Sequence, residues 1–345
     1  MLLKFTFHQL TPWFFKSNTT FDLGTWGDTY KIPQISTVIG AIRSVIGTLK
    51  GVDWKKYRLG LVPDVDKLIG KYGTQEELPF VVYGPFIGKG DDVYFPLPSI
   101  VKVYPRGENG ILVKRAVLTS IEHEYKNYDG SSTRKLRLFG KLPSLKEESG
   151  YYLNICGMDN FLKGKDIKEK DVEYIEFAEV VEEIGVSLNL DRRAAGEENG
   201  MYRIRRIFMK PSFTIVAYAY FADNVRENVP IGIVEVPFGG KGMSKVEVSI
   251  GEDLIRKWIT SRGNLVYLAS DYYLSSDGLP LPNLDVPVKA AAVGKPRPYR
   301  VLPSGMSIDK STGVVKHLAP QGSVFVFEEK TYIKNIPFFW GKEEV

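Results

Sequence analysis

Hydrophobic and polar residues alternate along much of the chain, and this pattern predicts a protein rich in β-strands. The alternation begins at residues 2–10 and returns in several later segments that glycine or polar residues separate. Because successive side chains of a strand point to opposite faces of a sheet, each segment is expected to bury one face. The strands predicted in this way are residues 2–10, 201–209, 213–222, 231–237, 244–250, 264–270, 286–292 and 322–328.

Three segments carry the period of an α-helix instead. Between residues 35 and 50, apolar side chains fall at positions 35, 38, 39, 42, 45, 46 and 49, and Pro33 stands where a helix begins. Residues 252–261 repeat this period. The acidic segment 172–184 could form a helix or a strand; its apolar residue at every third position favours a helix, which Gly185 would end.

The mixed order of these elements predicts the α+β fold class. A hairpin is expected where residues 111–126 and 134–142 flank the turn Tyr128–Ser132. The chain has 345 residues, which is more than one hydrophobic core usually holds, so two domains are expected.

A loop between two predicted strands is rich in glycine and lysine. It holds Gly239, Gly240, Lys241, Gly242 and Lys245. Glycines let another molecule's backbone come close, successive backbone N–H groups can surround an anion, and the lysines add positive charge. A hairpin turn that needs a positive φ explains the same glycines. The loop is therefore either an anion site or a tight turn.

The predicted helix at residues 35–50 has a second narrow face beside its apolar stripe. This face carries Ser36, Gly40, Arg43, Gly47 and Lys50. Small residues let a partner's backbone lie close, and a guanidinium can bind phosphate with two parallel hydrogen bonds. Tight packing of this helix on a sheet, with an incidental arginine, is the alternative explanation.

Further basic residues lie in segments 289–300 and 191–200. In the first, prolines limit the freedom of a loop that presents Lys295, Arg297 and Arg300. These cations suit phosphates, and Tyr299 suits stacking on an unpaired base; a solvated loop is the alternative. In the second, charges of both signs surround Arg192 and Arg193, which suits a protein contact or simple solvation.

Alternation places Arg203 and Arg205 on one face of a predicted strand and Arg206 on the other. The net charge of the chain is +5, which mildly favours an anionic partner.

The single cysteine, Cys156, excludes an intramolecular disulfide, and its apolar neighbours predict a buried thiol. No signal-peptide run begins the chain, and its longest apolar window, Phe213–Ala222, is far shorter than the ~20 residues of a membrane span. A cytoplasmic protein without membrane contact is expected.

Catalytic chemistry has little support in the sequence. His8, His123 and His317 have neither metal-ligand spacing nor a cysteine pair beside them. The acidic run Gly88–Asp92 is expected to be a hairpin tip, because Lys89 stands where a metal-binding palm needs glycine. No catalytic residue, metal or cofactor is therefore predicted.

The order of several segments resembles a known family. They are Leu10–Lys16, Pro33–Arg43, Gly84–Ile87, Tyr94–Pro98, Ile184–Arg192, Asn199–Arg203, the glycine-rich loop and Ala319–Phe325. In this order they resemble the RAMP (repeat-associated mysterious protein) subunits of CRISPR effector complexes. The resemblance is strongest to the third subunit of the Cmr, or type III-B, complexes.

This resemblance implies a fold and a function. The fold would be two tandem ferredoxin-like βαββαβ domains with long insertions, at residues 1–175 and 176–345. The function would be non-catalytic RNA binding, in which the glycine-rich loop and the helix carrying Arg43 grip the repeat-derived 5′ tag of a guide RNA. The large polymerase-like subunit and the backbone RAMP subunits would be partners. The alternative is a metal-independent endoribonuclease that cuts guide precursors, with His8 or His317 and Lys241 at its site.

Overall fold

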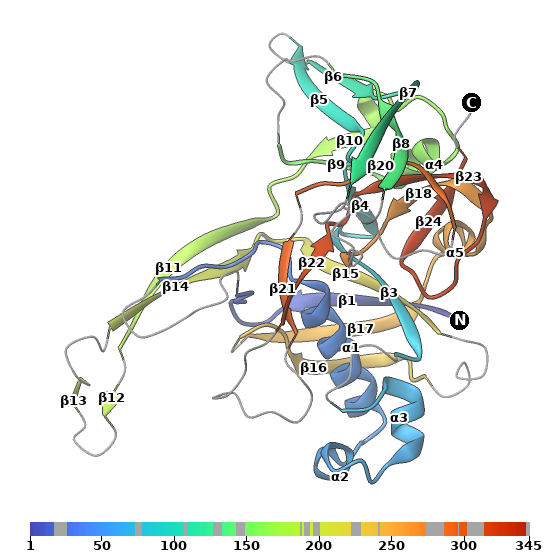
Figure 1. The fold of residues 1–345 in the computed structure, drawn as a ribbon. Helices are drawn as coiled ribbons and strands as arrows, with labels where there is room; N and C mark the ends of the chain where they lie inside the picture. Colours follow the sequence, from blue (N-terminus) through green and yellow to red (C-terminus); the bar gives the residue numbers. More distant parts are fainter. Residues whose placement is uncertain are drawn as a thin grey trace.

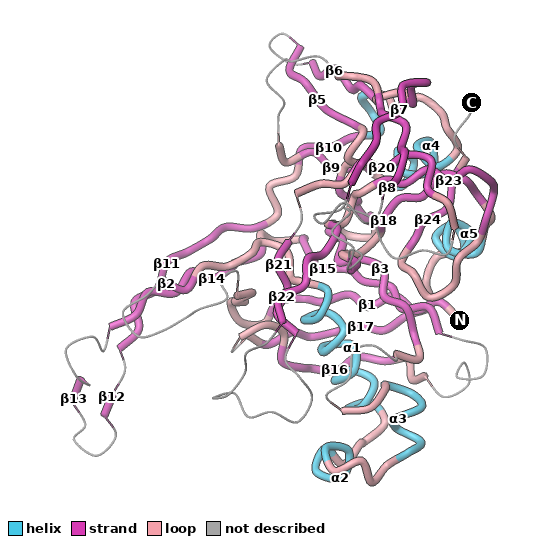
Figure 2. The backbone as a smooth tube through the Cα atoms, in the orientation of Figure 1, coloured by secondary structure: helices cyan, strands magenta, loops and turns pink. Residues whose placement is uncertain are grey.

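Antiparallel sheets dominate the structure and a few short helices cover them (Figure 1), so the α+β prediction is confirmed. The computed structural model describes residues 1–16, 26–72, 78–106, 110–126, 133–142, 149–186, 188–189, 194–195, 201–221, 229–240, 242–273, 286–295, 297–301 and 314–342. Figure 2 separates the helices and strands from their connections by colour.

An eight-stranded antiparallel sheet forms the centre of the molecule, with strand order β10-β9-β4-β3-β15-β1-β17-β16. Strand β1 lies between β15 and β17, and its alternation puts Leu3, Phe5 and Phe7 in one core. The strand bounds are β1 Leu2–Gln9, β3 Phe80–Lys89, β4 Asp92–Pro96, β9 Tyr151–Leu153, β10 Val172–Tyr174, β15 Phe213–Phe221, β16 Gly232–Pro237 and β17 Met243–Ile250.

A second sheet of six strands has the order β24-β18-β23-β20-β8-β7. One of its faces shares a core with the central sheet, and the other face buries Phe325, Phe327 and Trp340. The predicted strand 322–328 thus supplies Phe325 and Phe327 to this core. The strand bounds are β7 Leu118–Lys126, β8 Thr133–Phe139, β18 Gly263–Leu268, β20 Val288–Ala292, β23 Val324–Thr331 and β24 Phe338–Gly341.

The helices fill both sides of the central sheet. Helix α1 covers the face of the central sheet that points away from the second sheet. It buries Val38, Ile42 and Val45 against that face. Helices α4 and α5 belong to the core between the two sheets, through residues such as Phe161 and Trp258. The bounds are α1 Ile35–Leu49, α2 Trp54–Arg58, α3 Pro63–Ile69, α4 Ile155–Leu162, the 3-10 turn η1 Glu169–Asp171 and α5 Asp253–Thr260.

A long hairpin projects from the body as an arm (Figure 1). It consists of β11 (Ala178–Val186) and β14 (Met201–Met209), and β2 (Trp26–Gly27) pairs beside β14. The remaining short pieces are β5 Val101–Arg106, β6 Gly110–Arg115, β12 Leu188–Asn189, β13 Ala194–Ala195, β19 Tyr272–Tyr273, β21 Arg297–Val301 and β22 Val314–Ala319.

The arm corrects one prediction: residues 172–184 form strands and not a helix. Their apolar spacing of three matched a helical stripe, but Val181 and Ile184 are 41% and 63% exposed. Segment 178–186 instead pairs residue by residue with 201–209, from Ala178 opposite Met209 to Val186 opposite Met201. Pairing with a distant partner strand has overridden a weak local period.

Two further predictions need correction. The expected strand 111–126 is two strands with different partners, since β6 pairs with β5 and only β7 forms the expected hairpin with β8. Cys156 is exposed and not buried, because it lies on the outer side of α4, while Met158 and Phe161 of the same helix face the core.

Strands from both halves of the chain share the central sheet. Five of its strands precede residue 175 and three follow it. The division at residue 175 and the tandem ferredoxin-like arrangement stay predictions. Within the described ranges, no helix combines the length and the apolar character needed to span a membrane.

Candidate nucleic-acid interface

The glycine-rich loop is a tight connection between β16 and β17. Phe238 N–H donates to the carbonyl of Gly242 at 2.9 Å, which closes the turn. Gly239 has a φ of 74°, a conformation that favours glycine. The hairpin-turn explanation is therefore confirmed for Gly239.

The glycines also let another segment come close, and that segment belongs to the same chain. We call residues Pro12–Lys16 the strap. A Cβ atom added to Gly239 would lie 2.7 Å from the carbonyl oxygen of Phe14, and one added to Gly242 would lie 2.8 Å from the Trp13 ring. Gly240 N–H donates to the carbonyl of Phe14 at 2.8 Å. On this side, the expected cradle is filled by the strap.

Aromatic rings hold the loop and the strap on the sheet. The Phe238 ring stacks on Phe7 of β1 at 4.4 Å and meets the rings of Trp13 and Phe15 edge-on at 5.1 and 5.3 Å. All four side chains are buried. Such pairs add to the stabilisation that burial alone provides, so Phe238 anchors the start of the loop on the sheet.

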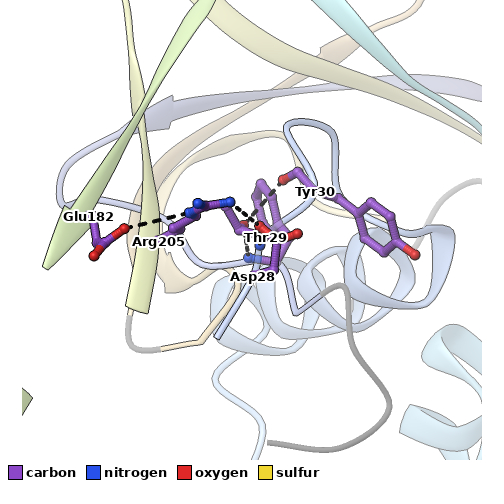
Figure 3. Close-up of polar contacts among 6 residues, drawn as sticks. Asp28, Thr29, Tyr30, Glu182 and Arg205 are labelled. Carbon is purple, nitrogen blue, oxygen red and sulfur yellow. Dashed lines mark hydrogen bonds and ion pairs between the residues drawn. The ribbon is translucent and has the colours of Figure 1, made fainter. Parts of the chain in front are cut away.

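The strap connects the loop to the start of α1 and to the base of the arm. Phe15 N–H donates to the hydroxyl of Thr29 at 2.9 Å, and Tyr30 N–H donates to the carbonyl of Phe15 at 2.8 Å. Figure 3 shows Arg205 of the arm between Glu182 and Asp28, at 3.8 and 3.5 Å. The glycine-rich loop, the residues that precede α1 and the arm therefore meet at the strap.

The amino end of α1 has the electrostatic character of an anion site. No side chain caps the helix at Gln34, and its first turn contains no acidic residue. The uncapped N–H groups and the helix dipole give this end a partial positive charge. Ser36 lies in this first turn, and Gly40, one turn on, is exposed with no atom within 4 Å of an added Cβ.

Farther along α1, the face of small residues is used within the chain. Trp54 of α2 packs directly on Gly47. Arg43 donates from Nε to the carbonyl of Ile69 at 2.6 Å and from a terminal nitrogen to that of Lys71 at 2.8 Å. Burial lowers the pKa of Arg43. This face therefore packs within the chain, but against the α2–α3 segment and not against a sheet as the alternative explanation held. Phosphate binding by Arg43 stays a prediction.

The other predicted cations are spread over several elements. Lys245 is exposed on β17, opposite His8 of β1, and Lys295 is exposed just after β20. Arg297 and Arg300 belong to β21, whose backbone pairs with β22; their side chains lie outside the described part of the structure. Lys241, Arg192 and Arg193 also lie outside the described residues.

The arm arginines show the predicted alternation. Arg203 and Arg205 both reach Glu182, at 3.3 and 3.8 Å. Arg206 pairs with Glu183 at 2.6 Å on the opposite face. Each of the three arginines thus has an acidic partner within the arm.

Comparison with protein families gives a match over nearly the whole chain. The family model of the CRISPR-associated protein Cas_Cmr3 matches residues 8–335, which include the strap, α1, the arm and the glycine-rich loop. The chain belongs to this family. It is therefore a Cmr-type CRISPR-associated protein, as the order of its segments indicated.

Solved structures of low sequence identity were also found. A chain in the type III-B Cmr-beta bound to cognate target RNA and AMPPnP is 16% identical over 94% of this chain and 86% of that chain, with a TM-score of 0.49. A chain in the Csm3-Csm4 subcomplex of the type III-A CRISPR-Cas interference complex is 11% identical over 99% and 97%, with a TM-score of 0.45. Comparison with curated proteins gave no match.

The Cmr-type chain shows no assembled metal site in its described part, where no group of three or more His, Cys, Asp and Glu residues gathers. His8 is half-buried on β1, and the His123 ring meets that of Tyr125 edge-on at 4.9 Å. His317 lies in β22, and its side chain is outside the described part. The run Gly88–Asp92 is the tip of the β3–β4 hairpin, as predicted.

Sequence reasoning gave no role to the strap aromatics Trp13, Phe14 and Phe15. The signal was present, since three consecutive aromatic residues follow a proline there. Their partner, Phe238, lies more than 200 residues later. Only the folded chain shows that the two segments need each other.

Proposed function

We propose that this chain is a non-catalytic RNA-binding subunit of a type III-B RNA-guided antiviral effector complex. In this proposal it grips the repeat-derived 5′ tag of the guide RNA. It also contacts the large polymerase-like subunit and the backbone RAMP subunits. Sequence selection would then come from base pairing along the guide.

One observation carries the RNA-binding part of the proposal: the glycine-rich loop, the strap and the uncapped start of α1 are joined into one rigid junction. The strap donates to Thr29 and accepts from Tyr30 just before the helix begins. Lys16, at the end of the strap, and Lys31, before the helix, are both exposed. A helix amino end with nearby lysines favours a phosphate group.

Gly40 supports a close approach of the RNA backbone. It lies one turn from the start of α1 on the exposed side, with open space where a side chain would be. Lys245, on the exposed face of β17 next to the loop, adds a positive charge. These groups suit a single strand that follows the surface from the loop towards α1.

The first test is to purify the tagged full-length chain from its native cells and sequence the RNA that accompanies it. Short RNAs with one shared repeat-derived 5′ end and varied sequence after it are expected. Precursors cut at a repeat would support the endoribonuclease, and the absence of RNA would refute both functions.

A second test uses charge at the loop. The Phe14 ring lies 2.9 Å from a Cβ added at Gly240, so Gly240→Asp adds a carboxylate beside this ring. The variant is expected to weaken binding of tag RNA about tenfold or more, because the carboxylate repels phosphate. Gly240→Asn has the same shape without the charge and serves as the matched control. Equal affinity of the two variants, with both folded, would refute this role of the loop.

A further inference from the structure

A second surface of the chain lies far from the glycine-rich loop, at the tip of the α2–α3 segment. Residues 50–72 form a small unit beyond the edge of the central sheet, at the bottom of the view in Figure 1. Between its two helices, Leu59 and Leu61 are 72% and 64% exposed. Aliphatic side chains exposed together in this way mark interaction surfaces.

This tip is held rigidly, so its exposed leucines are not a sign of a loose end. Trp54 packs on Gly47 of α1, and the buried Tyr57 donates its hydroxyl to the carbonyl of Gly70 at 2.8 Å. Arg43 of α1 binds the two carbonyls on either side of Gly70. A surface fixed in this way loses little conformational entropy when a partner binds.

The rim of the tip is positively charged. Residues 50–72 contain six basic and three acidic residues. The acidic residues are engaged internally: Asp53 caps α2, Asp64 pairs with Lys67 at 3.2 Å, and Asp66 interacts electrostatically with Arg43. Next to the leucines, the exposed Lys55, Lys56 and Arg58 have no ion-pair partner within the part of the chain that the structure describes.

We propose that this tip docks on an acidic protein surface that holds an apolar socket for Leu59 and Leu61. The basic rim requires an acidic partner by charge complementarity. Leucine side chains offer no flat ring on which a base can stack, so these two exposed leucines fit an apolar protein pocket and not a nucleic acid. The partner is another protein subunit of the assembly, so this inference rests on the proposed function.

The test compares the free chain with the assembly purified from native cells by hydroxyl-radical labelling, before and after nuclease digestion. Labelling of Leu59 and Leu61 is expected to fall at least fivefold in the assembly and to stay low after digestion. Unchanged labelling overturns the docking site. Protection that nuclease removes also overturns it, because RNA would then be the occupant.

Variants then test the charge. Lys55→Glu/Lys56→Glu is expected to lower recovery of the full-length chain with the assembly at least tenfold. The control Lys330→Glu/Lys334→Glu makes the same charge change at and beyond the end of β23, at other exposed positions. Equal loss for both double variants, or no loss for either, overturns the docking site.

The two proposals can fail separately. If the chain is recovered with RNA but Leu59 stays labelled, only the docking site fails; a chain recovered with neither RNA nor protein contradicts both proposals.

Discussion

Two glycines of this chain, Gly242 and Gly40, stand in opposite surroundings. Gly242 lies against the carbonyl of Phe238 and the ring of Trp13, at 2.6 and 2.8 Å from an added Cβ. Gly40 has open space on its exposed side. The first glycine is required by the packing of the chain itself, whereas the fold does not need the second one.

Alanine at these two positions is therefore expected to change stability in opposite directions. Gly242→Ala overfills a packed site and should lower the free energy of unfolding by about 1–3 kcal/mol. Gly40→Ala replaces glycine inside an exposed helix and should raise it by about 0.5–1 kcal/mol. Urea denaturation of the full chain measures both. A change of the same sign for both would contradict the contrast. A loss of RNA affinity in the more stable Gly40→Ala would report a close approach of RNA.

At the scale of elements, a polar cluster joins three strands at one end of the central sheet. Glu173 of β10 accepts hydrogen bonds from Lys89 of β3 at 2.5 Å and from the hydroxyl of Tyr94 of β4 at 2.7 Å. Partial burial would raise the pKa of Glu173, but these two bonds outweigh it and hold the pKa below its usual range.

A carboxyl with a lowered pKa stabilises the fold above its unfolded-state pKa of about 4.3. That contribution is lost as the pH falls through the lower folded-state value. Lys89→Met removes one of the two bonds, so the variant should lose less stability than the wild type between about pH 6 and pH 3. Urea denaturation at both pH values measures this difference.

Lys67→Met is the control, because it breaks an exposed pair with Asp64 inside α3, where ion pairs contribute little. It should keep the wild-type dependence on pH. If Lys89→Met also keeps the wild-type pH dependence, the hydrogen bonds to Glu173 do not make the stability of the fold depend on pH.

On the scale of the whole molecule, the first strand binds the two halves of the sequence together. Strand β1 is hydrogen-bonded on one side to β15 and on the other to β17, and its Leu3, Phe5 and Phe7 are fully buried. At the other end, Lys342 N–H donates to the carbonyl of Leu162 in α4 at 2.8 Å. The central sheet therefore needs residues from both halves.

Separate fragments 1–175 and 176–345 are expected not to fold alone. Fragment 176–345 lacks the strand between β15 and β17, and fragment 1–175 lacks the strand between β1 and β3. Neither should unfold cooperatively on heating, whereas co-expressed fragments should form a complex. Cooperative unfolding of each isolated fragment would instead support the predicted boundary at residue 175.

Local patterns predicted most of the elements correctly. Helix α1, helix α5 and the strands β1, β14, β15, β16 and β17 lie within two residues of their predicted bounds. Their periods are strong because each buries one continuous face. The helix prediction for segment 172–184 was wrong, because the two strands there carry apolar residues three positions apart. Nothing in the local sequence marks the pairing with residues 201–209.

The sequence by itself determined the strand-rich α+β class, the long helix with its stripe of small residues and the family to which the chain belongs. These depend on local period and on the order of segments along the chain. Only the tertiary structure decided what these glycines and Arg43 touch: the strap at Gly242, Trp54 at Gly47 and two carbonyls at Arg43. The reason is physical, because a glycine or an arginine permits many contacts and the packing of distant segments selects one.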